Sequence, residues 1–203
     1  MADRTVQPKV TTFAGLSLDQ PRIMGIVNVT PDSFSDGGEA LRVEDAASRG
    51  RAMLAAGADI LDIGGESTRP GATPVSVDEE CARVSPVIET LADEGALISI
   101  DSQRAAVMRT AVAAGAKIVN DVTALDGDPD AAAVVAETGV SVILMHMQGA
   151  PQTMQENPTY DVPSQDIRDY LAGRIAVCEA ADISRDRIAV DAGIGFGKTL
   201  DHN

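Results

Sequence analysis

The sequence predicts an α/β protein whose strands form one parallel sheet, and two regularities support this prediction. Short apolar runs of strand length alternate with segments that have the apolar spacing of a helix. A glycine stands shortly before several of the strands, in the stretches AAGAD, DEGAL, AAGAK and ETGVS. Because strands that alternate with helices form βαβ units, the strands should run parallel. With 203 residues the chain can bury one sizeable core, and we expect residues 1–203 to form a single domain.

The elements are expected in a regular order along the chain. Residues 1–21 are polar with short alternating pieces, and they predict a hairpin-like extension that plugs one end of the domain. Apolar runs predict strands at residues 23–29, 59–63, 96–100, 117–119, 140–145 and 187–190. Apolar faces and end signals predict helices at residues 43–56, at about 77–91 after a Ser76–Glu79 capping box, at 103–114 after a Ser102 cap, and at about 164–181.

A polar residue stands at the carboxyl end of every predicted strand. These residues are Asn28, Asp62, Asp101, Asn120, His146 and Asp191. In a parallel barrel such ends meet on one face, and in a doubly wound sheet they line a crevice. A hydrogen bond that merely ends a strand would explain any single one of them, but the repetition at every strand favours a shared site.

Three of these residues suit one kind of ligand. Asp101, Asn120 and Asp191 offer carboxylate and amide acceptors, which a flat heterocycle with several N–H donors requires when it is buried. Met145 and Phe196 fit the apolar walls of such a pocket, and they fit plain core positions equally well. For His146 we expect a hydrogen-bonded histidine at a strand end and not a metal ligand, since no histidine cluster accompanies it.

Composition excludes several classes of function. The net charge of −15 and the isoelectric point near 4.3 argue against nucleic acid or an anionic membrane as a partner. No run is long and apolar enough to span a bilayer, and the first residues lack the apolar core of a secretion signal, so we expect a cytoplasmic protein. Cys81 and Cys178 lack metal-ligand spacing and are expected to be reduced thiols.

The glycine-rich run near the end of the chain does not have the spacing of a nucleotide-binding loop. Gly193, Gly195 and Gly197 precede a Lys-Thr pair, but a phosphate-binding loop would need glycine where Ala192 stands. We expect this run to be flexible backbone that passes close to a ligand, with Asp191 directed inward.

Six stretches together resemble dihydropteroate synthase, an enzyme of folate biosynthesis. They are GIVNVTPDSFSDGG (25–38), DIGGESTRPGA (62–72), ISIDSQ (98–103), IVNDV (118–122), LMHMQG (144–149) and DAGIGFGKT (191–199). The resemblance implies a (β/α)8 TIM-type barrel that usually forms a homodimer. It also implies the condensation of 6-hydroxymethyl-7,8-dihydropterin pyrophosphate with p-aminobenzoate, by an SN1-like displacement that uses Mg²⁺ and releases pyrophosphate.

The resemblance also assigns roles to individual positions. Asn28 corresponds to the position that holds the metal and pyrophosphate. Positions that correspond to the pterin site are Thr68, Asp101, Asn120, Met145, Asp191 and Phe196. Those that correspond to the p-aminobenzoate site, on two loops that close over the pocket, are Phe34, Thr68 and Pro70. The residues that we expect to be catalytic are Asp36, Arg69 and Asp101.

The chain departs from the resemblance in length. Only six of the eight strand–helix units are present, and the family's seventh-strand Lys and eighth-strand Arg and His have no counterpart. Either the synthase is shortened or another chain completes it. We expect the chain to keep its pterin-recognition carboxylates but to have weak or no turnover.

Two alternatives stay open. A pterin-binding methyltransferase domain would share the barrel and a similar Asp/Asn/Asp cup, but it would not need the loops TPDSFSDGG and STRPG. A non-catalytic pterin-binding or interaction module would explain the missing cationic groups.

Overall fold

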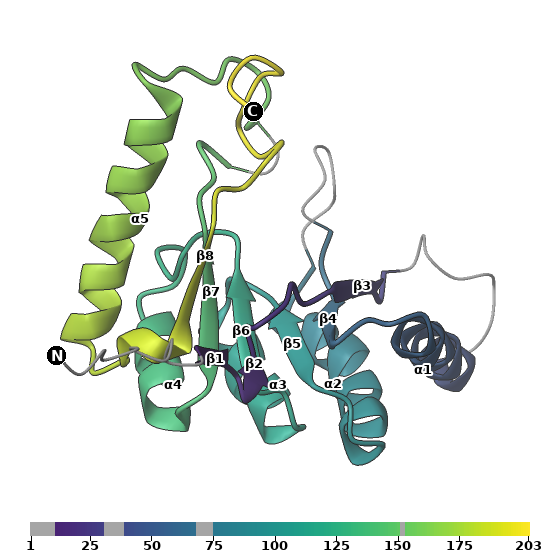
Figure 1. Ribbon diagram of the computed structural model, residues 1–203. Coiled ribbons are helices and arrows are strands. Elements are labelled where there is room, and N and C mark those ends of the chain that lie inside the picture. The colour runs from purple at the N-terminus through teal and green to yellow at the C-terminus, as the bar shows by residue number, and fades with distance from the viewer. Residues whose placement is uncertain (1–10, 31–38, 68–74, 151–152) are drawn as a thin grey trace, which may run out of the picture.

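Six parallel strands form one sheet in the computed structural model, which describes residues 11–30, 39–67, 75–150 and 153–203 (Figure 1). The strands of this sheet are β3 (Met24–Asn28), β4 (Ile60–Gly64), β5 (Ile98–Asp101), β6 (Ile118–Asp121), β7 (Ser141–Met145) and β8 (Ile188–Asp191). The helices are α1 (Glu39–Ala55), α2 (Val77–Asp93), α3 (Ala105–Ala113), α4 (Ala131–Thr138) and α5 (Pro163–Ala180), and a 3-10 turn, η2 (Arg185–Arg187), precedes β8. All six predicted strands are therefore confirmed, with ends that differ by a few residues.

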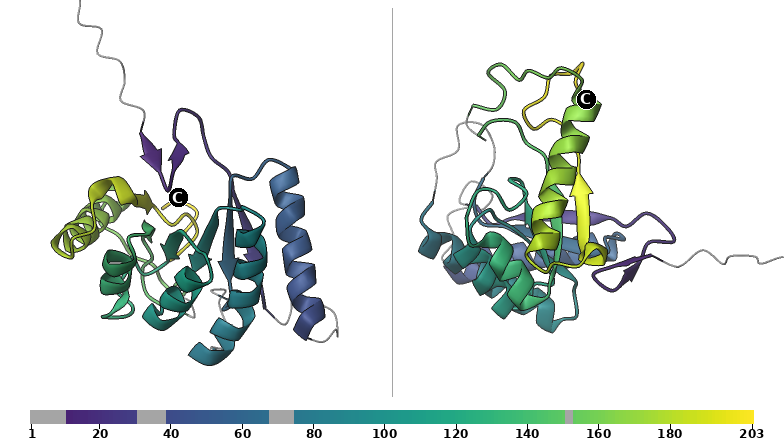
Figure 2. Two further views of the ribbon diagram at one scale, coloured as in Figure 1. Left: turned by 90° about the horizontal axis from the view of Figure 1, so that it is seen from below. Right: turned by 90° about the vertical axis from the view of Figure 1, so that its left-hand side faces the viewer.

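The sheet is the wall of a partial barrel. Each strand pairs with the next one along the chain, in the order β3-β4-β5-β6-β7-β8, and every pairing is parallel. The helices lie along the outer face of the curved sheet, and α5 stands at the end of the row beside β7 and β8 (Figure 2). This sequential order is that of a (β/α)8 barrel and differs from a doubly wound sheet, in which the order reverses at a switch point.

One helix was not foreseen, and one predicted helix cap was wrong. The sequence AAAVVAET forms α4, which was not among the expected helices, because its small apolar residues show little contrast between an apolar and a polar face. Ser102 does not cap α3 directly: the cap position is Arg104, and the Ser102 hydroxyl accepts the Arg104 backbone N–H at 3.2 Å. The predicted cap of α2 is confirmed, since the Ser76 side chain accepts the Glu79 backbone N–H.

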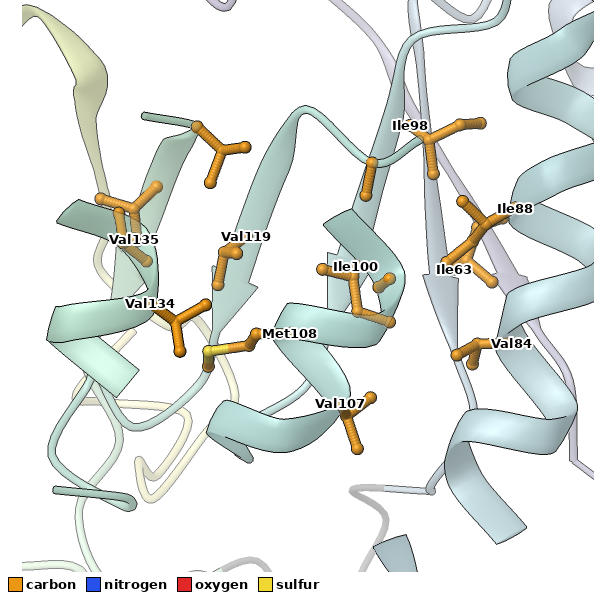
Figure 3. Close-up of a cluster of buried hydrophobic side chains, with 14 of the residues drawn as sticks. Ile63, Val84, Ile88, Ile98, Ile100, Val107, Met108, Val119, Val134 and Val135 are labelled. Atoms are coloured by element: carbon orange, nitrogen blue, oxygen red, sulfur yellow. The ribbon is translucent and has the colours of Figure 1, made fainter. Parts of the chain in front are cut away.

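The main core lies between the outer face of the sheet and the helices. Ile63, Ile100 and Val119 project from neighbouring strands toward α2, α3 and α4 (Figure 3). They meet Ile88 of α2 and Met108 of α3, which are fully buried as well. Because apolar side chains fill the outer face of the strands, the alternate residues of the same strands face the lumen of the barrel.

A short hairpin covers the amino ends of the strands. Strands β1 (Thr12–Phe13) and β2 (Leu16–Ser17) pair antiparallel, and Phe13 packs against Ile60 and Ile118 at the start of β4 and β6. The turn between them holds Ala14 and Gly15 at positive φ, of 48° and 83°. This end of the lumen is thus filled with apolar side chains, which leaves the carboxyl ends of the strands for a site.

The two outermost strands expose apolar side chains. Ile26 of β3 shares a register position with Asp62 and so faces the lumen, yet it is 58% exposed. Val190 of β8 lies on the outer face and is 52% exposed. In a closed barrel further strands and helices would cover these positions, because closure removes the edges of a sheet.

The two cysteines lie on different helices, Cys81 on α2 and Cys178 on α5. Cys178 is buried and Cys81 is half-buried, and both are free thiols. Within the part of the chain that the structure describes, no helix is both long and apolar enough to cross a membrane.

Candidate active site at the carboxyl ends of the strands

Polar side chains from neighbouring strands share the inner face of the sheet at its carboxyl end. Asn28 pairs in register with Gly64, Gly64 with Asp101, and Asp101 with Asn120. Residues paired in this way point to the same side of a sheet. A Cβ atom at Gly64 would lie 3.4 Å from Asn28 Oδ1 and 3.5 Å from Asp101 Oδ2. Because Gly64 has no side chain, the space between the Asn28 amide and the Asp101 carboxylate is not filled by the residue between them.

The Asp101 carboxyl lies in a strongly acidic environment. Burial raises its pKa well above the ordinary value, and the negative charges of Asp62, Asp121 and Glu80 raise it further. The ionised form of this group is thus costly in the free protein. A ligand that presents N–H donors or positive charge would offset that cost, because it favours the carboxylate over the neutral acid.

Asp62 does not lie at the end of its strand, as the sequence suggested, but in the middle of β4. Its Oδ2 accepts a hydrogen bond from Asn120 Nδ2 at 3.0 Å, and the residue is 3% exposed. Asp62 Oδ1 and Ser99 Oγ are both buried without a hydrogen-bond partner. Asp62 pairs with Ser99, two positions before Asp101 on β5, so its carboxyl lies deeper in the lumen than that of Asp101. It binds the Asn120 side chain directly.

Asp191 ends the outermost strand of the sheet. It shares a register position with Met145, and its Oδ1 accepts the Gly193 backbone N–H at 2.8 Å. Met145 is buried and Asp191 is exposed. The prediction of an inward direction agrees with the register, which places Asp191 on the lumen side of the sheet together with Met145 and Ile143.

A buried lysine anchors the glycine-rich segment that follows β8. Lys198 Nζ lies 3.0 Å from His146 Nδ1 and donates to the carbonyls of Gly193 at 2.8 Å and Phe196 at 2.9 Å. Burial lowers the pKa of His146, and the charge of Lys198 lowers it further. His146 is thus a neutral acceptor for the lysine, and its ring also packs edge-on against Tyr170. The expectation of a satisfied strand-end histidine is confirmed, but its partner was not foreseen.

The glycines of this segment allow it to pack closely against the loop that follows β7. Gly193 and Gly197 have positive φ, of 66° and 60°. A Cβ atom at either position would collide with the backbone carbonyl of His146 or of Gln148. Both glycines therefore lie against the loop that follows β7, and this close packing accounts for them; the expectation that the run passes close to a ligand stays a prediction. Phe196, expected as a wall of the pocket, is half-buried in the same segment.

Five predicted site residues lie outside the described residues. They are Phe34, Asp36, Thr68, Arg69 and Pro70. The residues that flank 68–74 are joined by a charged cluster. Arg104 donates to Glu66 Oε1 at 2.9 Å and to the Val75 carbonyl at 2.7 Å, and it forms an ion pair with buried Glu80 at 3.0 Å.

The loop after β6 has a strained backbone that α5 supports. Ala124 and Leu125 both have positive φ, of 53° and 61°, which is rare for residues other than glycine. Arg174 donates to the carbonyl of Ala124 through Nε and to that of Leu125 through Nη2, each at 2.8 Å. Sequence reasoning missed Arg174, Arg104 and Lys198. Their only signal was a charged residue within a mostly apolar region.

Among the described residues, no group of three His, Cys, Asp or Glu side chains could hold a metal ion. Asn28 offers a single amide oxygen at the edge of the site. This fits an ion that takes most of its ligands from substrate phosphate and water, which is the common arrangement for Mg²⁺.

An arc of parallel barrel strands with polar side chains clustered at their carboxyl ends is the framework of a barrel enzyme, whose active site lies at that end. Residues 24–203 match the family described as pterin binding enzyme, and the chain belongs to this family. The relatives that it matches include dihydropteroate synthases of several bacteria. The enzyme of that name from Escherichia coli (strain K12) is 49% identical over 189 residues, which cover 93% of this chain and 67% of the relative. The one from Neisseria meningitidis serogroup C is 48% identical over 190 residues, with 93% and 67% covered.

Solved structures show the same likeness. Dihydropteroate synthase of Xanthomonas albilineans with 4-aminobenzoic acid has 51% identity and a TM-score of 0.85, over 94% of this chain and 68% of that one. The enzyme of the same organism in complex with 7,8-dihydropteroate has 46% identity and a TM-score of 0.81, over 93% and 66%. The chain thus spans about two thirds of the length of these relatives, in agreement with six of eight barrel units.

Proposed function

We propose that this chain carries the pterin site of a dihydropteroate synthase, which joins 6-hydroxymethyl-7,8-dihydropterin pyrophosphate to p-aminobenzoate. The observation that carries the proposal is the shared inner face of Asn28, Asp101 and Asn120 around the open position of Gly64. Solved relatives with 4-aminobenzoic acid and with 7,8-dihydropteroate bound support this choice of substrates.

The acceptors suit the donors of a pterin ring. Asp101, Asn120 and Asp191 would accept the ring N–H groups, and Met145 and Phe196 would lie against its faces. Two carboxylates and an amide give each buried donor of the ring a partner. Such a site discriminates strongly against rings that lack these donors, because the carboxylates would then stay unpaired.

The same residues suit the displacement reaction. The bond between the methylene carbon and the pyrophosphate oxygen breaks first, and its electron pair leaves with pyrophosphate. The cation that forms is delocalised into the pterin ring, where the Asp101 carboxylate stabilises it. The amine of p-aminobenzoate then bonds to the carbon and releases a proton. The high pKa of Asp101 in the free protein means that its charge is stabilised most when the cation is present.

The leaving group is placed at the edge of the site by Asn28. When bound, Mg²⁺ would neutralise the charge of the departing pyrophosphate. Asn28 would hold the ion through its amide oxygen. Residues proposed for the p-aminobenzoate side are Phe34, Thr68 and Pro70, with Asp36 and Arg69 as further catalytic groups.

Calorimetric titration tests the proposal. Binding of the pterin pyrophosphate that requires Mg²⁺ is expected. Binding of a methylated pterin without metal would instead support a methyltransferase domain, and a lack of binding to either ligand would support a non-catalytic module. For residues 1–203 on their own we expect weak turnover, because β3 and β8 each have an unpaired edge in this sheet. Steady-state pyrophosphate release at the rate usual for such enzymes would contradict that expectation.

Two further expectations concern the protein as a whole. A homodimer is proposed for a complete barrel, and a cytoplasmic location is proposed for the enzyme. Both rest on the resemblance to the synthases and stay predictions.

A further inference from the structure

A buried carboxylate beneath the proposed pterin site has a contact that the proposed reaction does not require. Asp62 is 3% exposed, and its Oδ2 accepts the Asn120 side-chain N–H at 3.0 Å. The two residues are 58 positions apart and come from strands that are not neighbours. The carboxylate of β4 thus reaches across β5 inside the lumen to hold the amide of β6.

This contact fixes which side of the Asn120 amide faces the ligand. In the structure Asp62 Oδ2 accepts from the amino nitrogen of the amide, Nδ2, at 3.0 Å. The amide oxygen is then directed away from Asp62 and is free for a donor in the lumen. Without this constraint, the amide could turn over and present its own donors to those of the ring.

Placing Asp62 in the lumen is energetically costly, which argues against a role in packing. Burial raises the pKa of the Asp62 carboxyl, and the hydroxyl of Ser99 and the amide of Asn120 only partly counteract it. The Ser99 hydroxyl faces Asp62 in the register, but neither Asp62 Oδ1 nor Ser99 Oγ has a hydrogen-bond partner of normal geometry. Buried polar atoms without partners are rare in folded proteins and call for a reason. An apolar residue would fill this position at a lower cost.

We propose that Asp62 is a positioning residue of the pterin site, which orients the carboxamide of Asn120 so that its oxygen accepts from the ring. The inference rests on the proposed function and deepens it. It explains how the Asn120 carboxamide, which could present either its oxygen or its amino group, selects a heterocycle whose facing edge carries N–H donors. Asp62 acts through Asn120 and is not itself proposed to touch the substrate.

The test is a double-mutant cycle that uses unsubstituted pterin as the probe and the full chain as the protein. Asp62→Leu is expected to weaken pterin binding about tenfold, a factor of ten being 1.4 kcal/mol. Asp62→Asn keeps a side-chain oxygen and the same volume, so its loss should stay within about threefold. In the background of Asn120→Ala, Asp62→Leu should have almost no further effect, because the group that it positions is gone.

A purely structural role predicts a different pattern. If Asp62→Leu only disturbed the packing of the lumen, it would weaken pterin binding by the same factor with Asn120 present and with Asn120→Ala. That outcome overturns the proposal. Equal affinity of Asp62→Leu and the unsubstituted chain would also overturn it. Ser141→Ala is the matched control. Ser141 is a buried polar residue on the same inner face, but it lies three strands from Asp62 along the same register row, and the affinity of this variant should not change.

One further measurement needs no substitution, and it applies if Asp62→Leu does not fold. In the ligand-free chain, one of the two side-chain amide protons of Asn120 should exchange slowly with water, because it is bound to Asp62. Two protons that exchange equally fast would overturn the inference. If the unsubstituted chain does not bind pterin at all, the proposed function fails and this inference with it. If it binds and the cycle shows no coupling, only the role of Asp62 fails.

Discussion

Replacing Arg104 by methionine is expected to destabilise the protein by about 3 to 5 kcal/mol, the usual cost of removing one partner of a buried ion pair. Arg104 Nη1 lies 3.0 Å from Glu80 Oε2, and the Glu80 side chain is 1% exposed. Without the guanidinium, Glu80 would keep only a hydrogen bond with Ser102 and the charge of Arg83. A buried carboxylate with so little compensation is unfavourable because its hydration is lost.

The loss should depend on pH in a defined direction. Burial raises the pKa of Glu80 above its ordinary value of 4.5. A carboxyl whose pKa is higher in the folded state binds its proton more tightly there, so the free energy of unfolding falls as the pH rises above that value. Arg104→Met should raise the pKa further. The variant should therefore lose more stability at about pH 8 than at about pH 5.

Denaturation by urea and heat measures both effects. A loss of this size corresponds to a fall of roughly 10 °C in the unfolding midpoint for a chain of this length. Arg109→Met is the matched control, because its ion pair with Glu137 is exposed and should contribute less than about 1 kcal/mol. The double variant Arg104→Met/Glu80→Met should recover most of the loss. A change below about 1 kcal/mol for Arg104→Met, or no recovery in the double variant, would refute the reasoning.

Three other substitutions test the site and the sheet edges. Asp101→Asn should raise the free energy of unfolding at neutral pH, because the pKa of the Asp101 carboxyl is raised in the folded protein and its ionisation costs stability as the pH rises. In a complete barrel the same substitution should lower turnover far more than it lowers the affinity for p-aminobenzoate. An unchanged rate would remove Asp101 from the mechanism. Lys198→Met should destabilise the chain by about 2 to 4 kcal/mol and speed amide exchange in residues 192–199, because the carbonyls of Gly193 and Phe196 lose their buried donor. Lys117 is exposed, so Lys117→Met should have neither effect. Ile26→Ser should reduce self-association in sedimentation experiments, because Ile26 is exposed on an outermost strand, and unchanged association would point to another surface.

The strands were predictable because their signals are local. Apolar runs bounded by Gly, Pro and polar residues marked all six. The polar residues near the ends of these runs indicated a candidate site, although Asp62 lies mid-strand and His146 contacts Lys198 and Tyr170. The helix at Ala131–Thr138 was missed because alanine and valine give weak periodicity. The capping box of α2 was recognised because it depends on two residues three positions apart.

The contacts that shape the site were not predictable in this way. Lys198 and His146 are 52 positions apart, and within the sequence the lysine looked like part of an incomplete nucleotide loop. Asp62 looked like one more strand-end residue, although it lies mid-strand beneath Asn120. The partners of Arg104 were not predictable, because Glu66 and Glu80 belong to another strand–helix unit.

The sequence by itself determined the repeated strand–helix order, the residues that could accept hydrogen bonds from a ligand, and the likeness to dihydropteroate synthases. These properties depend on residue type and on spacing over a few positions, which the chain carries without folding. Only the tertiary structure decided which hydrogen-bond acceptors lie together on the inner face, that Asp62 binds Asn120, and that buried Glu80 has an ion-pair partner. Such contacts depend on register and curvature of the sheet, which bring residues many positions apart within about 3 Å of each other.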